Sequence, residues 1–236
     1  MIVLVDADSL VWSSCYRQKE HPEDDGLNTL QEAIGKFDEV FMKIINTIEE
    51  TYNLEKVIVF NNSIGNFRKQ ISKTYKANRI KRDVPEILWQ LHDHVSNSYE
   101  SKKGIGVETD DIVARYWKEL SDTFGRNEVI IVSIDKDYTQ LPCLIYNYHS
   151  KHQCYYKITE ESAKYNFYKQ MIIGDTADNV NFCKGYGAKW VENAFEDCVS
   201  DYSYIRVVFE LYKKLHKGKA RERFIQCHRL LKLKTE

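Results

Sequence analysis

Three short apolar runs of strand type alternate with helical patterns, and this alternation limits the possible folds more than any other feature. The runs are Ile2 to Val5, Lys56 to Phe60 and Glu128 to Ile134. Between the first two, apolar side chains recur every three or four residues from Leu30 to Ile48, which is the period of a long amphipathic helix. Strands that alternate with helices predict an α/β fold with a mainly parallel sheet.

The rest of the chain extends the same pattern. We expect helices over Leu10 to Arg17, from Pro85 and after Thr109, and short strands at Leu144 to Tyr146 and Tyr155 to Ile158. From residue 160 onward the pattern is helical, apart from a loop over 174–187. A length of 236 residues suits one large domain. Glycine (10) and proline (3) are scarce, which argues against a turn-rich sandwich.

Acidic side chains gather where predicted strands end and predicted helices begin. They are Asp6 and Asp8; Glu108, Asp110 and Asp111; Asp135 and Asp137; and Asp175 and Asp178. Because the carboxyl ends of parallel strands form one edge of a sheet, these side chains are expected to lie together. Packed carboxylates repel one another unless cations are present, and Mg²⁺ or Mn²⁺ prefers oxygen ligands. Two such ions about 4 Å apart support phosphodiester cleavage.

The net charge of −1 hides a strong segregation of charge along the chain. Residues 67–82 contain seven Lys or Arg and no acid, and residues 213–234 contain nine and a single acid. The remaining residues together carry −16. Basic stretches with interleaved aromatic side chains suit a nucleic-acid backbone. A merely solvated helix face is the alternative interpretation of each stretch.

A glycine-containing loop over residues 179–189, NVNFCKGYGAK, precedes a predicted helix. Its two glycines allow a close approach of the backbone to a phosphate, and Lys189 adds positive charge. Such a loop contacts a nucleic-acid backbone without reading bases. There is no Walker loop, GxGxxG or GxSxG, which disfavours a nucleotide-driven motor, a dehydrogenase and a serine-triad hydrolase.

The cysteines and the apolar runs limit the compartment. No run approaches the length of a membrane span, and Met1 to Val5 is too short for a signal peptide. The six cysteines form no CxxC pair, which favours reduced thiols in a cytosolic protein. Cys143, His149, His152 and Cys154 lie close in sequence, but their spacing fits no common zinc pattern, so a structural zinc is a minor alternative.

Five motifs occur in the order typical of one family. They are VDADSL, FRKQISKTYKANR, GVETDD, SIDKDYTQL and IGDTADNVNFCKGYGAK. From Met1 to about Ser200 the chain therefore resembles the 5′-nuclease family, which includes bacteriophage 5′–3′ exonucleases, flap endonucleases and the 5′-nuclease domain of bacterial DNA polymerase I. The resemblance implies a PIN-like α/β core and a single 5′-nuclease domain over residues 1–236. It also implies a helical arch at about 66–104, a helix–three-turn–helix DNA-binding motif at about 170–200 and a basic helical segment over 201–236.

The resemblance further implies two Mg²⁺ ions, which Mn²⁺ can replace. Asp6, Glu108 and Asp110 would hold the first ion, and Asp111, Asp135, Asp137, Asp175 and Asp178 the second. Asp6, Asp135, Lys76 and Arg79 would be catalytic, the two cations by neutralising the scissile phosphate. Contacts to DNA would come from Arg68, Lys69, Lys73, Tyr75, Lys76, Arg79, Gly185, Gly187 and Lys189, with a K⁺ ion in the Gly185–Gly187 loop. For Tyr75, packing is the alternative to stacking on a base.

Two departures from the family pattern matter. Asn61 follows the second strand where the family has an aspartate, and its amide carries no charge. Asn181 and Phe182 replace the Pro-Gly of the glycine loop, as in some phage members, which favours a phage or phage-like origin.

The favoured function is a Mg²⁺-dependent, structure-specific 5′ nuclease that acts on flaps, nicks or RNA–DNA primers in phage-type DNA replication or repair. We expect a monomer in the cytoplasm, that of a bacterial host if phage-encoded, with branched DNA and replication proteins as partners. Asn61 motivates an alternative, a catalytically weakened DNA-junction-binding protein. A large gain of cleavage in Asn61→Asp from a near-zero baseline would favour that alternative. An RNA-directed PIN nuclease ranks last.

Overall fold

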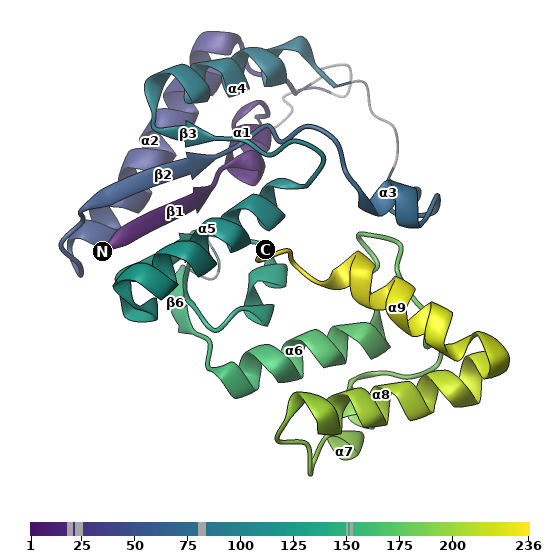
Figure 1. The fold of residues 1–236 in the computed structure, drawn as a ribbon. Helices are drawn as coiled ribbons and strands as arrows, with labels where there is room; N and C mark the ends of the chain where they lie inside the picture. Colours follow the sequence, from purple (N-terminus) through teal and green to yellow (C-terminus); the bar gives the residue numbers. More distant parts are fainter. Residues whose placement is uncertain (18–20, 22–25, 80–83, 150, 152) are drawn as a thin grey trace.

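The computed structural model describes residues 1–17, 21, 26–79, 84–149, 151 and 153–236. It is a mixed α/β structure built around one six-stranded sheet (Figure 1). The strands are β1 (Ile2–Asp6), β2 (Lys56–Phe60), β3 (Ser101–Lys102), β4 (Val129–Val132), β5 (Leu144–Asn147) and β6 (Cys154–Lys157).

The sheet has the order β3-β2-β1-β4-β5-β6, and only the pairing of β5 with β6 is antiparallel. The predicted mainly parallel sheet is thus confirmed. In register, Asp6 of β1 lies beside Phe60 of β2, and Val5 lies beside Val132 of β4. The central position of β1 places the end of this strand at the middle of the carboxyl edge. The strand β3 was not predicted, because two residues give no periodicity.

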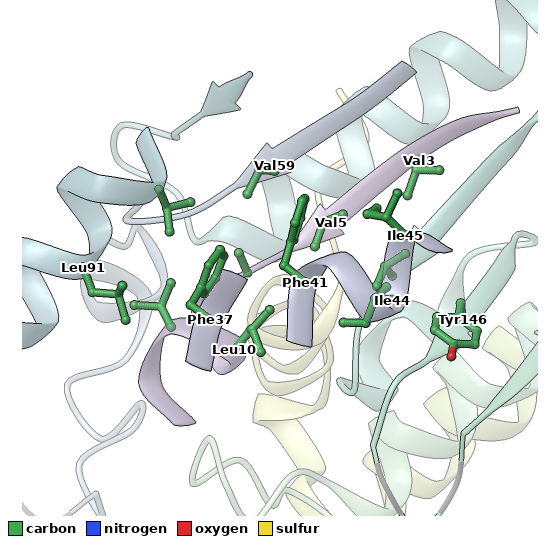
Figure 2. Packing of buried hydrophobic residues seen from close by; sticks show 14 of the residues in the cluster. Val3, Val5, Leu10, Phe37, Phe41, Ile44, Ile45, Val59, Leu91 and Tyr146 are labelled. Atoms are coloured by element: carbon green, nitrogen blue, oxygen red, sulfur yellow. The ribbon is translucent and has the colours of Figure 1, made fainter. Parts of the chain in front are cut away.

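Helices cover both faces of the sheet (Figure 1). One face carries α1 (Asp8–Ser14), α2 (Leu30–Glu49) and α4 (Glu86–Ser98), and the other carries α5 (Thr109–Phe124). Figure 2 shows Phe37, Phe41 and Ile44 of α2 packed beside Val3 and Val5 of β1. Because side chains alternate along a strand, β1 sends its other apolar residues toward α5. Burial on both faces explains the continuous apolar runs of the sequence.

A second lobe consists of helices with their own hydrophobic core. It contains α6 (Glu160–Ile173), α7 (Ala188–Ala194), α8 (Asp201–His216) and α9 (Ala220–Leu231). Short 3₁₀ helices occur at Arg126–Glu128 (η1), Lys136–Gln140 (η2) and Lys217–Lys219 (η3). After α9 the chain returns to the sheet lobe, where Leu233 is buried in the core beneath α5 (Figure 1). The C-terminal residues thereby join the two lobes.

The segment predicted to form the arch divides into two parts. Its first part contains the short helix α3 (Arg68–Ile71) and a series of turns up to Arg79. Residues 80–83, which include the last two bases of the basic stretch, lie outside the described residues. The second part is α4 and β3, and Leu91 and Val95 of α4 are fully buried in the core. The predicted arch boundary of about 104 is therefore corrected, because α4 is a core helix.

Two smaller expectations concern the cysteines and the membrane. The six cysteines all lie among the described residues, and none of them forms a disulfide. In the β5–β6 hairpin, Cys154 pairs with Asn147, whereas the carbonyl of Cys143 accepts from Ile158 at the other end, so the two thiols share no metal ion. His152 lies outside the described residues. Within the described ranges, no helix has the length and apolarity needed to cross a membrane.

Candidate active site

The candidate site is centred on Asp6, the last residue of β1. The Tyr138 hydroxyl donates to Asp6 Oδ2 at 2.8 Å, and Ser133 Oγ lies 3.4 Å from the same oxygen. Burial raises the pKa of Asp6 to about 7, and the nearby charges of Asp8 and Asp135 add to this rise. The surroundings of Asp6 therefore disfavour the negatively charged form of its carboxylate.

The turn after β4 brings two more carboxylates to this edge. Asp135 begins η2 as its N-cap and accepts from the Asp137 N–H at 2.9 Å. Gln170 of α6 donates to Asp137 at 2.8 Å, which links the helical lobe to the site. Burial raises the pKa of Asp135, and burial together with the charge of Asp135 raises the pKa of Asp137 to about 7.

The start of α5 supplies the third group of acids. Glu108 is the N-cap of α5 and forms a capping box with Asp111. Burial raises the pKa of Asp110 well above its usual value, and the charges of Asp111 and Glu108 act in the same direction. The pKa of Asp110 is also raised by Asp135, so α5 and the turn after β4 converge on one place.

Asp111 and Arg68 form a buried, bidentate ion pair. Arg68 donates to the two carboxylate oxygens of Asp111 at 2.6 and 2.8 Å, and to Glu108 at 3.0 Å. Its remaining donors reach the carbonyls of Leu230 and Lys232. Arg68 is 2% and Asp111 1% exposed. In this structure, therefore, Arg68 and Asp111 are buried against each other, while the DNA contact of Arg68 and the metal contact of Asp111 stay predictions.

The turns that follow α3, up to Arg79, contact the acidic side chains of the site. Lys76 Nζ bonds Glu108 Oε1 and is 3.5 Å from Asp178, and Arg79 is 3.1 Å from Asp178. Burial would raise the pKa of Glu108, but Lys76 and then Arg68 outweigh it and hold that pKa below its usual value. The hydroxyl of the buried Tyr75 lies 2.8 Å from Glu108 and 2.6 Å from Asp178 and donates its single proton to one of these carboxylates at a time. Tyr75 is thus packed within the site in this structure, and its contact with DNA stays a prediction.

The loop after α6 completes the acidic side of the site. Asp175 accepts from Lys136 at 2.8 Å and from the backbone N–H of Ala177 and Asp178. Burial would raise the pKa of Asp175, but Lys136 more than offsets this effect, so the pKa of Asp175 is lowered. These contacts connect the loop to the turn after β4.

The donor set fits a hard divalent cation. Asp6, Asp110, Asp135 and Asp137 are crowded carboxylates whose pKa values are all raised, which a bound dication would reverse. Among the residues that the structure describes, however, no three acidic, histidine or cysteine side chains are already gathered tightly enough to enclose an ion. The bonds of Lys76 to Glu108 and of Lys136 to Asp175 help to explain this.

The other predicted DNA contacts lie apart from these acids. Lys69 in α3 and Lys73 in the turns that follow α3 are both exposed. Gly185, Gly187 and Lys189 are exposed at the start of α7, in the helical lobe, and Gly185 has a φ of +88°. Tyr138 and Gln170 were missed as site residues. Tyr138 lies within the motif SIDKDYTQL, so its position after the two aspartates was a usable signal.

Comparison with known proteins places the chain in a family. The family model for the 5′–3′ exonuclease N-terminal resolvase-like domain matches residues 1–167. The chain therefore belongs to the 5′–3′ exonuclease family, as its motifs predicted.

Relatives by sequence agree. The chain is 25% identical to DNA polymerase I of Borreliella burgdorferi over 91% of this chain and 25% of the polymerase. It is 29% identical to a 5′–3′ exonuclease of Buchnera aphidicola from Acyrthosiphon pisum, over 72% of this chain and 64% of the exonuclease. A 5′–3′ exonuclease of Mycoplasmopsis pulmonis is 26% identical, over 99% of this chain and 79% of the relative. The chain thus spans a quarter of the polymerase and less than two thirds of the Buchnera protein.

Solved structures share the fold. A variant of the bacteriophage T5 D15 flap endonuclease, in a pseudo-enzyme-product complex with DNA and metal ions, has a TM-score of 0.71 at 16% identity, over 99% of this chain and 89% of that one. The catalytic core of Rad2 in complex with a DNA substrate has a TM-score of 0.54 at 13% identity, over 96% and 73%. These likenesses confirm the PIN-like α/β fold.

Proposed function

We propose that the chain is a structure-specific 5′ nuclease that hydrolyses phosphodiester bonds in branched or nicked DNA with a 5′ end or flap. The observation that carries this is the crowding of Asp6, Asp110, Asp135 and Asp137 near one edge of the sheet, with Lys76 bonded to Glu108 and Arg79 to Asp178 beside them. Acids beside cationic side chains suit a reaction at a phosphate. The names of the relatives support the same activity.

Two groups of carboxylates would hold divalent cations. Asp6, Glu108 and Asp110 would hold one, and Asp135, Asp137, Asp175 and Asp178 the other. Mg²⁺ held there, or Mn²⁺ in its place, supplies Lewis-acid stabilisation of charge on the phosphate and a lower pKa of the attacking water. The chain itself orients these ligands: Tyr138 fixes Asp6, and Gln170 fixes Asp137.

The cations act on the substrate strand. Lys76 and Arg79 bond Glu108 and Asp178 in this structure, and a phosphate entering the site competes for the same side chains. Released from the acids, they neutralise charge that develops on the scissile phosphate. Lys69, Lys73, Lys189 and the loop of Gly185 and Gly187, with a K⁺ ion, would hold the backbone away from the cut.

The test uses a labelled 5′-flap duplex, its RNA–DNA counterpart, and Mg²⁺ or EDTA. We expect cleavage with Mg²⁺ and none with EDTA. Asp135→Asn, which keeps an N-cap acceptor, should lower turnover by about 100-fold or more while binding in Ca²⁺ stays within about threefold. The control Asp122→Asn alters an exposed acid at the far end of α5 and should leave both unchanged. Tight binding with no cleavage by the wild type at any concentration would instead favour a junction-binding protein.

A further inference from the structure

Asn61, which follows β2, contributes no charge to the site. Its amide forms hydrogen bonds with residues outside the site. Asn61 is 0% exposed. Its Nδ2 donates to Ser101 Oγ of β3 at 3.3 Å, and its Oδ1 accepts from Ser96 Oγ of α4 at 3.4 Å. Both polar atoms of this amide thus bond side chains on the β3–α4 side of β2. A ligand needed between β1, β2 and α5 must come from another residue.

Asp8 occupies that place. The parallel pairing of β1 with β2 continues past Asp6, because the Ala7 N–H donates to the Phe60 carbonyl at 2.9 Å. Asp8 Oδ1 then accepts from the Asn62 N–H at 2.9 Å, and its Oδ2 accepts from Thr109 Oγ1 at 2.6 Å. The Asp8 carboxylate therefore bridges the loop after β2 and the first turn of α5, adjacent in sequence to Asp110.

The surroundings of Asp8 contain buried polar atoms that need partners. His92 of α4 is 6% exposed, and within the described part of the chain its Nδ1 has no hydrogen-bond partner; the same holds for the buried hydroxyl of Tyr148. His92 and Tyr148 both lie within electrostatic reach of Asp8, and Tyr148 within that of Asp6. Buried polar groups are rarely left without partners, and the water shell of a cation supplies them.

We propose that Asp8 is a carboxylate ligand of the first metal ion and supplies the negative charge that Asn61 does not. This inference rests on the proposed metal-dependent function. Asp6, Asp8 and Asp110 come from the end of β1, the start of α1 and the start of α5; Asp8 lies within electrostatic reach of Asp6 and accepts from Thr109, the neighbour of Asp110. With Asp8 included, the donor set keeps the charge that a dication requires although residue 61 is neutral.

The test measures Mn²⁺ binding by calorimetry and by the loss of the free-Mn²⁺ paramagnetic resonance signal. Asp8→Asn should weaken the tightest Mn²⁺ site by about tenfold or more, and Asp122→Asn should leave it unchanged. In the double variant Asp8→Asn/Asn61→Asp, the affinity should return to within about threefold of wild type, because the carboxylate is moved rather than lost. Asn61→Asp alone should gain less than about threefold, since Asp8 already supplies the charge.

Different outcomes distinguish a failure of the Asp8 inference from a failure of the proposed function. If the wild type binds Mn²⁺ and cleaves the flap, but Asp8→Asn binds Mn²⁺ equally well, Asp8 has only a structural role and the inference is wrong. Should Asp8→Asn fail to fold by circular dichroism, the Asn61→Asp arm still decides: a gain of tenfold or more would show that the ligand was missing. A wild type that neither binds Mn²⁺ nor cleaves the flap overturns the proposed function itself.

Discussion

The pair of Arg68 and Asp111 shows how one residue can determine the geometry of a site that it does not enter. Arg68 has five N–H donors, and its bonds hold Asp111, Glu108 and the carbonyls of Leu230 and Lys232, at the end of α9, in place. Its large desolvation is outweighed by the charges of Asp111 and its neighbours, so the pKa of Arg68 is raised further. This pair therefore fixes the N-terminus of α5.

Replacement of Arg68 should make the folded protein less stable. We expect Arg68→Ala to lower the free energy of unfolding by about 3–5 kcal/mol, because it leaves Asp111 buried without its partner. Arg68→Lys should lose less, since the charge remains but not the bidentate geometry. Urea unfolding measures both, with the exposed neighbour Lys69→Ala as control, which should stay within about 0.5 kcal/mol. Unchanged stability with weakened DNA binding in Arg68→Ala would restore its predicted role as a DNA contact.

The raised pKa of Asp6 makes stability depend on pH. An aspartate in an unfolded chain has a pKa of about 4, whereas burial and the charge of Asp8 raise that of Asp6 to about 7. Between these values the folded protein keeps a proton that the unfolded chain has released, so stability falls as the pH rises from about 4 to about 7.

Comparison of the wild type with Asp6→Asn separates the titration of Asp6 from that of His92 and Glu108, whose pKa values are also shifted. Urea unfolding in EDTA at several pH values should show the wild type losing stability relative to Asp6→Asn as the pH rises to about 7, with no further loss above. A constant difference between the two proteins across this range would show that Asp6 titrates normally.

At the scale of elements, the turns of residues 72–79 dock on the loop of residues 175–179. Asn78 donates to the Thr176 carbonyl at 2.6 Å, Asn179 to the Thr74 carbonyl at 2.8 Å, and the Lys76 N–H to the Asp178 carbonyl at 2.9 Å. These bonds place the Lys76 side chain on Glu108. In this position the lysine and a cation compete for one carboxylate.

Lys76→Met should therefore have opposite effects on two measurements. The Mn²⁺ affinity should rise by about threefold, because Glu108 is freed, while flap cleavage should fall by about 100-fold, because one of the two cations that meet the phosphate is lost. Lys43→Met, which changes an exposed lysine of α2, provides the control and should change neither by more than about twofold. A parallel fall in metal affinity and cleavage would argue against the competition.

Periodicity predicted most elements but not their partners. The strand β2 has the predicted ends, and α2 begins at Leu30 as expected, because buried apolar residues repeat with a clear period. The helix α4 was assigned to the arch because its sequence resembles any amphipathic helix, and only packing on α2 shows that it belongs to the core. The acids Asp6, Asp110 and Asp135 were foreseen together, since strand ends share an edge. Contacts between Arg68 and Asp111, or Asp8 and Asn62, depend on tertiary pairing that no local pattern encodes.

For the whole molecule, the segregation of charge along the sequence becomes a segregation between regions. The basic C-terminal stretch forms the end of α8, η3 and α9, where Lys219 and Arg221 are exposed, whereas the crowded carboxylates lie at the edge of the sheet. A surface of this kind attracts a phosphate backbone with an affinity that depends on salt.

The variant Lys219→Ala/Arg221→Ala should weaken binding to flap and plain duplex alike and reduce the slope of log K against log salt by up to about 2. Gel shifts in Ca²⁺ over a salt series provide the slope. Lys43→Ala/Lys118→Ala removes equal charge from α2 and α5 and should keep the wild-type slope. Equal slopes for both double variants would mean that α9 and η3 do not contact the backbone.

The return of the chain to α5 has a consequence for handling the protein. The amino group of Met1 bonds the Asn53 carbonyl at 3.0 Å, at the edge of the sheet opposite the acids. By contrast, the Lys234 N–H donates to Asp111 at 3.0 Å, two residues before Glu236. A purification tag or fluorescent fusion at the amino end therefore emerges on the far side of the sheet from the site. The same tag at the carboxyl end begins beside the ion pair that anchors α5.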